Sequence, residues 1–342
     1  MTESGIVFHI AEPDMPARTR LGILAALLLG AATLGGIRDA AAAERITIAT
    51  VGRGQPPQWA TFIANSKGFF AENGVSVELV AAQSAAAATL QVAAGSAQMS
   101  VGGMTEVMLG IDHGAKLTLL SIETQVPPYS LFAKRTITSI KELRGKVVIV
   151  GGAKDVTLIY FERMAAANGL KPGDYDLLYA GTTPARYAAL ASGSVDAAIL
   201  YPPGSFEAAS QGYPNIGNLS DYVKDMPFTG YAVDHAWAAN NKPAVIAFLK
   251  GVHKAVNWFY DTNNRAEAVA ILVKESGQSQ DNIEKTYDYY RSLRIFPEDG
   301  TIDAKKLTSL VQALAQMSTL TGPADPQRFV NPTMAKLISD AR

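Results

Sequence analysis

The stretch that most constrains the fold lies at residues 62–106, where helix and strand patterns alternate with their turn signals in place. Apolar residues recur at helical spacing ahead of Gly74, and residues 75–79 then alternate as a short strand. A second helical face covers residues 86–94, and residues 99–101 form the next strand. This alternation predicts α/β units with right-handed crossovers and ligand sites at the carboxyl ends of the strands.

Backbone N–H donors are expected where strand 99–101 ends. The strand runs into Gly102-Gly103, and Thr105 could cap the helix that begins there. The first N–H groups of a helix have no partner within it, so they would point into the space above the strand end. Gly103, Met104 and Thr105 are therefore predicted to contact a ligand.

Four segments follow one another along the chain in a familiar order. They are KGFFAENGVSVELV with its later AAGSAQ turn and glycine pair (67–103), SIKELRGKVVIV (139–150), AALASGSVDAAI (188–199) and AVIAFLKGVHKA (244–255). In this order they resemble the solute-binding proteins of nitrate, sulfonate and taurine type ABC importers, a family shared with binding proteins for thiamine-pyrimidine precursors. The resemblance implies a two-lobed periplasmic binding protein fold of type II, in which mostly parallel sheets flanked by helices enclose a ligand cleft.

The length of 342 residues independently favours two lobes over one core. Pro127-Pro128 breaks the chain before a predicted crossing, and the turn at Gly95 has a counterpart at Gly193. We predict that lobe one begins with residues 44–132, that residues 133–230 form lobe two, and that residues 231–342 return to lobe one and add packing helices.

Residues 1–43 are predicted to be an N-terminal extension followed by an export signal. Two arginines precede the apolar run 21–34, and Ala41-Ala42-Ala43 supplies small residues for signal peptidase, so cleavage is expected after Ala43. The run is shorter than the roughly 20 apolar residues that span a bilayer. Met15 heads a more ordinary signal than Met1, and either could be the start.

Composition excludes several classes of function. The 30 basic and 31 acidic residues nearly cancel, so no field favours nucleic acid or an anionic membrane. The chain has no cysteine, hence no disulfide, no thiol nucleophile and no lipid-bearing cysteine. A freely soluble, monomeric periplasmic protein of a double-membraned bacterium is expected.

Catalytic signatures are missing from the sequence. His9, His113, His235 and His253 are not spaced for a metal, and the Gly52-Arg53-Gly54 triplet lacks a dinucleotide fingerprint. His113 is expected to satisfy helix-end carbonyls, and His253 to be a surface or boundary residue. The fungal branch that makes the thiamine pyrimidine carries a cysteine-rich motif that this chain lacks. We therefore expect no enzyme activity, no cofactor and no metal.

A binding function has better support, because each lobe has a glycine pair before a helix. The turns at Gly102-Gly103 and at Gly151-Gly152-Ala153 would aim helix N-termini at a shared cleft, which favours an oxyanion or a carboxylate. The glycines could instead merely permit tight turns. Their occurrence in both lobes favours the binding interpretation, with Gly152 and Ala153 in contact with the ligand.

Several polar residues could complete the site. Arg53 and Lys154 could neutralise an anion, although Lys154 could equally form a solvated pair with Asp155. Thr182 or Thr183 could cap the helix that begins there and also bond the ligand. Tyr201 stands where related proteins often have glutamate, and its phenol could stack on the ligand or donate a hydrogen bond.

Glu106 and Trp59 leave the ligand class open. Glu106 could close a capping arrangement with Thr105, or face the cleft and require an amine or hydroxyl on the ligand. Trp59, with Gln55 and Gln58 beside it, could stack on a planar ligand or belong to the core.

The interpretation as a whole is an extracytoplasmic binding component that captures a small organic anion (a sulfonate, a carboxylate or a pyrimidine-like solute) and delivers it to a permease and its ATPase. The alternatives are a ligand sensor for a membrane receptor, a periplasmic enzyme on the same fold and a structural or adhesive surface protein.

Overall fold

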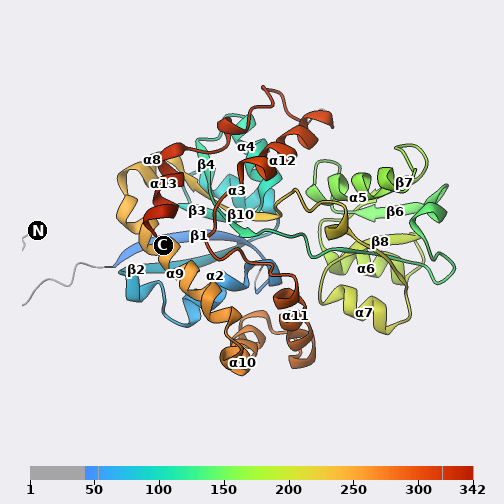
Figure 1. The fold of residues 1–342 in the computed structure, drawn as a ribbon, viewed down its shortest axis with the longest axis horizontal. Coiled ribbons are helices and arrows are strands. Elements are labelled where there is room, and N and C mark those ends of the chain that lie inside the picture. The colour runs from blue at the N-terminus through green and yellow to red at the C-terminus, as the bar shows by residue number, and fades with distance from the viewer. Residues whose placement is uncertain (1–42, 53, 318, 342) are drawn as a thin grey trace, which may run out of the picture. The chain divides into compact units, whose positions relative to one another are not determined.

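Two five-stranded sheets form the framework of the chain from Glu44 onward (Figure 1). The computed structural model describes residues 43–52, 54–317 and 319–341. The predicted extension and export signal therefore lie outside the described residues, apart from Ala43. We call each sheet with the helices around it a lobe.

The sheet of lobe one has the strand order β2-β1-β3-β10-β4. Its strands are β1 (Glu44–Val51), β2 (Val75–Ala82), β3 (Met99–Gly103), β4 (Leu117–Thr124) and β10 (Thr229–Asp234). Strand β1 is parallel to β2 and β3, whereas β10 is antiparallel to both of its neighbours. Every residue of β4 is buried, because helices and the C-terminal segment cover it.

The sheet of lobe two has the order β7-β6-β8-β5-β9. Its strands are β5 (Ser130–Ala133), β6 (Val147–Val150), β7 (Asp176–Tyr179), β8 (Ala197–Leu200) and β9 (Asn215–Asn218). Strand β6 is parallel to β7 and β8, and β5 is antiparallel to β8 and β9. Each sheet thus contains one strand that runs antiparallel to both of its neighbours. This strand is the first one in the sequence after the chain crosses from the other lobe.

Helices cover both sheets, and Figure 1 shows α5, α6 and α7 gathered around the second sheet. Lobe one begins with α2 (Trp59–Ser66), α3 (Ala85–Ala93) and α4 (Met104–Asp112), and lobe two has α5 (Val156–Ala167), α6 (Thr183–Ala191) and α7 (Gly204–Ser210). The chain ends with α8 (His235–Asn240), α9 (Lys242–Tyr260), α10 (Arg265–Ser276), α11 (Gln280–Ser292), α12 (Ala304–Gln316) and α13 (Pro332–Asp340). Short 3-10 helices are η1 (Pro56–Gln58), η2 (Ala71–Asn73), η3 (Ile140–Leu143), η4 (Leu219–Asp221), η5 (Thr262–Asn264) and η6 (Pro326–Arg328).

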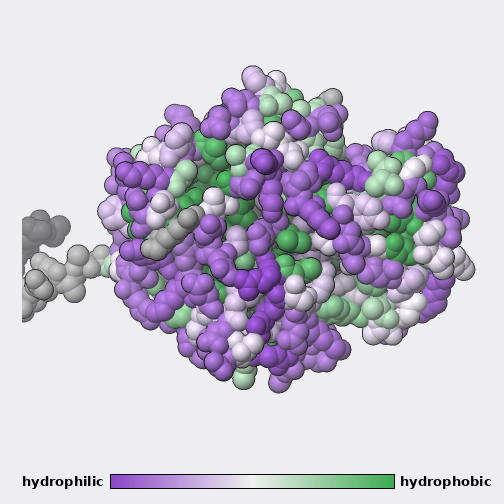
Figure 2. Space-filling model, viewed as in Figure 1, coloured by the Kyte–Doolittle hydropathy of each residue, from purple (hydrophilic) through white to green (hydrophobic). Residues whose placement is uncertain are grey.

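The long helix α9 shows why its sequence folds onto lobe one. Apolar residues recur along one face of this helix at helical spacing, and all of them are buried: Val245, Phe248, Leu249, Val252, Val256 and Phe259. His253 was expected at the surface or its boundary, but only 8% of it is exposed, because α9 is covered on more than one side. The face of the molecule shown in Figure 2 is largely hydrophilic, with hydrophobic residues in separate patches.

Candidate functional site

A cavity of about 540 Å³ is lined by residues of both lobes. The first lobe supplies residues from η1, from the starts of α3 and α4, and from β10, and the second supplies residues from the loops after β6, β7 and β8. Those loops follow the carboxyl ends of parallel strands, the place where open α/β sheets present ligand sites. The principal polar and aromatic lining residues are Gln55, Gln58, Glu106, His113, Tyr129, Lys154, Asp155, Thr182, Tyr201 and Thr229.

Half of the residues predicted from the sequence are brought together in this lining: Gln55, Gln58, Gly103, Lys154, Thr182 and Tyr201. The described lining does not include Trp59, Met104, Thr105, Gly152 or Ala153. Arg53 lies outside the described residues.

Trp59 belongs to the core of lobe one rather than to the cavity. Its side chain has no exposed surface, and its ring centroid lies 5.5 Å from that of Tyr290. Trp59 is the first residue of α2, and its side chain lies on the face of that helix that packs toward α9 and α11. Of the two roles that the sequence left open for Trp59, the structure therefore shows the core role, with its ring tilted by 46° against that of Tyr290.

Tyr201 and Gln55 join the two lobes directly. The Tyr201 hydroxyl donates to Gln55 Oε1 over 2.7 Å, and the phenol ring meets Tyr129 edge to face at a centroid distance of 5.2 Å. Burial raises the pKa of Tyr201, although nearby Arg186 opposes the rise, so the hydroxyl stays a donor at neutral pH. The sequence suggested that Tyr201 could donate a hydrogen bond to the ligand. In the structure it donates to Gln55 of the opposite lobe instead.

Gln58 lies in the lining of the cavity but is almost fully buried. Only 2% of this residue is exposed, and its Nε2 donates to the carbonyl of Val101 over 3.2 Å. Its Oε1 has no hydrogen-bond partner among the described residues and almost no accessible surface, so this oxygen does not face the cavity.

Glu106 both faces the cavity and covers the start of α4. The N-cap of α4 is Gly103, not Thr105, because the helix begins at Met104, two residues earlier than a cap at Thr105 would place it. Thr105 lies inside the first turn and donates to Glu106 Oε2 over 2.8 Å. A Cβ on Gly103 would lie 2.2 Å from that oxygen, so glycine is required there for the carboxylate to fold back. Burial, and secondarily the charge of Asp155, raises the pKa of Glu106 to about 7.

Asp155 has the corresponding place in lobe two. It is the N-cap of α5, and its Oδ1 accepts hydrogen bonds from the backbone N–H and the hydroxyl of Thr157. A Cβ on Gly151 would lie 2.5 Å from the same oxygen. The sequence suggested only a solvated pair with Lys154, although a position just before an apolar helix is also the usual signature of a cap.

Arg186 supports this wall of the cavity from behind. It is 1% exposed, and it donates to the carbonyls of Ile199 and Ala180 and to Thr183 Oγ1 over 2.6, 2.8 and 2.9 Å. The guanidinium therefore ties α6 to the ends of β7 and β8. Sequence reasoning missed Arg186, because an arginine on an amphipathic helix usually faces solvent.

The remaining predicted polar residues are exposed at the mouth. Lys154 and Thr182 both line the cavity and are both exposed. Thr182 is the N-cap of α6, but its side chain makes no capping hydrogen bond, which corrects the expected cap. His113 ends α4 as expected and also lines the cavity. The satisfaction of helix-end carbonyls by its imidazole stays a prediction.

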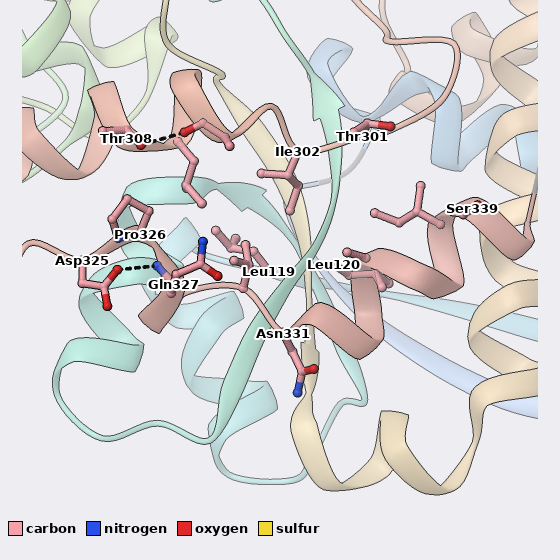
Figure 3. Close-up of a pocket in the computed structure, with 15 residues that line it drawn as sticks. Leu119, Leu120, Thr301, Ile302, Thr308, Asp325, Pro326, Gln327, Asn331 and Ser339 are labelled. Carbon is pink, nitrogen blue, oxygen red and sulfur yellow. Dashed lines mark hydrogen bonds between the residues drawn. The ribbon is translucent and has the colours of Figure 1, made fainter.

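A second cavity of about 220 Å³ lies within lobe one, between β4 and the C-terminal segment (Figure 3). Leu119, Leu120 and Ile302 give it an apolar wall. Among its polar residues, the Gln327 backbone N–H donates to Asp325 Oδ1, and Asn331 bonds the ring of His235. It is smaller, involves one lobe only and has few convergent polar groups. The cavity between the lobes is therefore the better candidate for a solute site.

The described residues offer neither a metal site nor a membrane span. No group of three or more His, Cys, Asp or Glu side chains there could hold a metal ion. None of the helices in the same part of the chain combines the length and apolarity needed to cross a bilayer.

Comparison with known proteins matches residues 55–266 to the family described as NMT1/THI5 like. The YtlA protein of Bacillus subtilis (strain 168) is 21% identical over 290 residues, which cover 82% of this chain and 86% of YtlA.

Solved structures share the fold at low sequence identity. The ligand-binding component of an ABC-type import system from Staphylococcus aureus, with zinc bound, has a TM-score of 0.73 and 13% identity, covering 86% of this chain and 98% of its own. The alkanesulfonate-binding protein SsuA from Xanthomonas axonopodis pv. citri, bound to MOPS, has a TM-score of 0.69 and 16% identity, covering 85% and 97%. The desulfurization enzyme DSZB has a TM-score of 0.64 and 15% identity, covering 87% and 99%. The predicted two-lobed type II fold is confirmed.

Proposed function

The chain belongs to the NMT1/THI5-like family, and from this premise we propose that it is the extracytoplasmic solute-binding component of an ABC importer. In this role it captures a small solute between its lobes and presents the closed form to an inner-membrane permease and its ATPase. The observation that carries the proposal is the cavity of about 540 Å³ lined from both lobes, which has the size of a small-molecule site.

Closure follows from differential contact. A solute that touches both walls stabilises the closed arrangement more than the open one, and only that difference can shift the equilibrium. Moving the population from one part in a hundred closed to the reverse requires about 5.5 kcal/mol. Hydrogen bonds between the solute and Glu106 on one side, and between the solute and Asp155 and Thr182 on the other, can supply this difference, with the Tyr201–Gln55 bond adding to the closed form.

The lining bears on which solute is captured. The sequence favoured an organic anion at the helix N-termini, but Glu106 and Asp155 already occupy the starts of α4 and α5. A sulfonate or a carboxylate would lie beside these acids, whereas a pyrimidine-like ring could offer N–H groups to them. Among the expected solutes, the pyrimidine-like class therefore fits the lining best.

An enzyme on the same fold is the second candidate, since Glu106 and Asp155 form a titratable pair inside the cavity. We nevertheless propose binding without turnover, because the chain has no cysteine nucleophile and the described residues form no metal site. Turnover of the bound solute by the purified protein would overturn this choice.

The test is identification of the solute that co-purifies with the protein, by mass spectrometry after denaturation. We expect one small molecule per chain, a rise in melting temperature when it is added back, and loss of its uptake by cells that lack the gene. Normal uptake in those cells, together with loss of a signalling response, would favour a sensor instead. Absence of any stabilising solute would contradict the proposal.

A further inference from the structure

We propose that the cavity between the lobes takes a ligand whose polar head is a basic nitrogen group (an ammonium or an amidinium), held by the carboxylates of Glu106 and Asp155. The inference rests on the proposed function and adds the chemical class of the solute. It departs from the organic anion that the glycine turns alone suggested.

An acceptor-only ligand cannot satisfy the acidic part of this lining. A sulfonate, nitrate or carboxylate has no N–H or O–H to donate to the oxygens of Glu106 and Asp155. Gln58 also lies in the lining, but its Oε1 has almost no accessible surface and takes no part in the proposed site.

The two carboxylates supply acceptors from opposite lobes. Thr105 donates to Oε2 of Glu106, and both hydrogen bonds from Thr157 reach Oδ1 of Asp155. Among the described side chains, none donates to Oε1 of Glu106 or to Oδ2 of Asp155. Both residues are half-buried and line the same cavity. Acceptors from both walls require a ligand with several N–H groups, as an amidinium or ammonium provides.

Positive groups near the cavity do not reverse this preference. The Lys154 side chain is exposed at the mouth, where solvent screens it. Arg186 directs Nε, Nη1 and Nη2 to carbonyls and to Thr183, and it does not line the cavity. His113 lines the cavity on the exposed end of α4.

The direction of proton exchange on binding distinguishes the two ligand classes. Burial and the charge of Asp155 raise the pKa of Glu106 to about 7, so near neutral pH the empty cavity holds a fraction of a proton on this carboxyl. A cation beside Glu106 lowers that pKa and expels the proton to buffer. An anion raises the pKa further and takes a proton up.

Benzamidine and benzoate are matched probes, since both carry a planar three-atom head on one ring. Calorimetry near pH 7 in buffers of different ionisation enthalpy gives both the Kd and the number of protons exchanged. We expect benzamidine to bind at least about tenfold more tightly than benzoate and to release protons, with a loss of about tenfold in each of Glu106→Gln and Asp155→Asn. Asparagine still caps a helix, so Asp155→Asn keeps α5 intact.

Two control variants separate the site from general charge effects. Glu207→Gln makes the same chemical change on the exposed face of α7 and should leave binding and proton release unchanged. His113→Gln should keep the proton release, which Glu106→Gln should abolish. Tighter binding of benzoate, proton uptake with benzamidine, no effect of Glu106→Gln, or no binding of either probe at millimolar concentration would overturn the inference. A sulfonate that closes the lobes with proton uptake would refute this ligand class and leave the proposed function standing.

Discussion

Replacement of Glu123 by glutamine should make the protein less sensitive to alkaline pH. Glu123 lies on β4 with 2% exposure, and its Oε1 accepts hydrogen bonds from Thr61 Oγ1 and Tyr231 Oη over 2.9 and 3.0 Å. Burial raises its pKa from an ordinary 4.5 to about 8, although these hydroxyls and that of Thr229 oppose the rise. The carboxyl therefore stays protonated in the folded chain at neutral pH.

The sign and size of the effect follow from proton linkage. Between pH 4.5 and about 8 the unfolded carboxylate has lost a proton that the folded chain retains, so the free energy of unfolding falls as pH rises through this window. At about 1.4 kcal/mol per pKa unit, the shift corresponds to a loss of at most about 5 kcal/mol. Glutamine has no proton to lose and should remove this contribution.

Urea unfolding of the wild type and of Glu123→Gln at several pH values measures the difference, and histidine titrations cancel between the two. Glu106 contributes in the same direction up to its pKa of about 7, so the interval from about pH 7 to about pH 8 reports mainly on Glu123. We expect the variant to gain up to about 1.4 kcal/mol on the wild type across that interval. Glu207→Gln, on the surface of α7, should behave as the wild type. Equal pH slopes for the wild type and Glu123→Gln would refute the reasoning.

Three further substitutions test the cavity. Tyr201→Phe removes the hydrogen bond to Gln55 that joins the lobes, which is worth about 1 kcal/mol. Small-angle scattering should therefore show a larger radius of gyration for the ligand-free variant than for the ligand-free wild type, and an unchanged radius would contradict this. Gly103→Ala places a Cβ against Glu106 Oε2 and should weaken solute binding by about tenfold in calorimetry, whereas unaltered affinity would show that the carboxylate is not held there. Arg186→Met leaves buried carbonyls unpaired and should lower the free energy of unfolding by about 3 kcal/mol in urea titrations; a loss below about 1 kcal/mol would mean that water replaces the guanidinium.

The backbone plan could largely be predicted from the sequence. The strands expected at residues 75–79 and 99–101 are β2 and β3, and the helix expected at residues 86–94 is α3, each within a few residues at its ends. Periodicity and turn residues report on burial and chain reversal, which are local properties. The antiparallel placement of β10 between β3 and β4 was not visible, because strand pairing depends on distant partners.

The site was predictable only in part, for a related reason. Glycine turns located the loops that carry Gly103 and Lys154, but a side chain's direction depends on what surrounds it. The sequence around Trp59 looks the same whether its ring contacts a ligand or packs in the core. It packs in the core because its face of α2 meets α9 and α11. Asp155 beside Lys154 looks the same in sequence whether it pairs with lysine or caps α5. The acidic character of the cavity therefore appeared only with the structure.

The prediction that the chain divides into residues 44–132, 133–230 and 231–342 remains a proposal about domain boundaries. Strand β5 already joins the second sheet at Ser130, and β10 joins the first at Thr229. Each position lies within a few residues of the predicted crossing. The segments between β4 and β5 and between β9 and β10 are the candidate hinges for closure.

The most direct test of solute capture between the lobes is the distance between them with and without ligand. The chain has no cysteine, so Ser96→Cys and Ser192→Cys place one dye on the exposed turn of each lobe for energy-transfer measurements. A solute that raises the melting temperature should shift the distribution to shorter distances, and the shift should be weaker in Glu106→Gln. An unchanged distribution at saturating solute would contradict closure as the basis of binding.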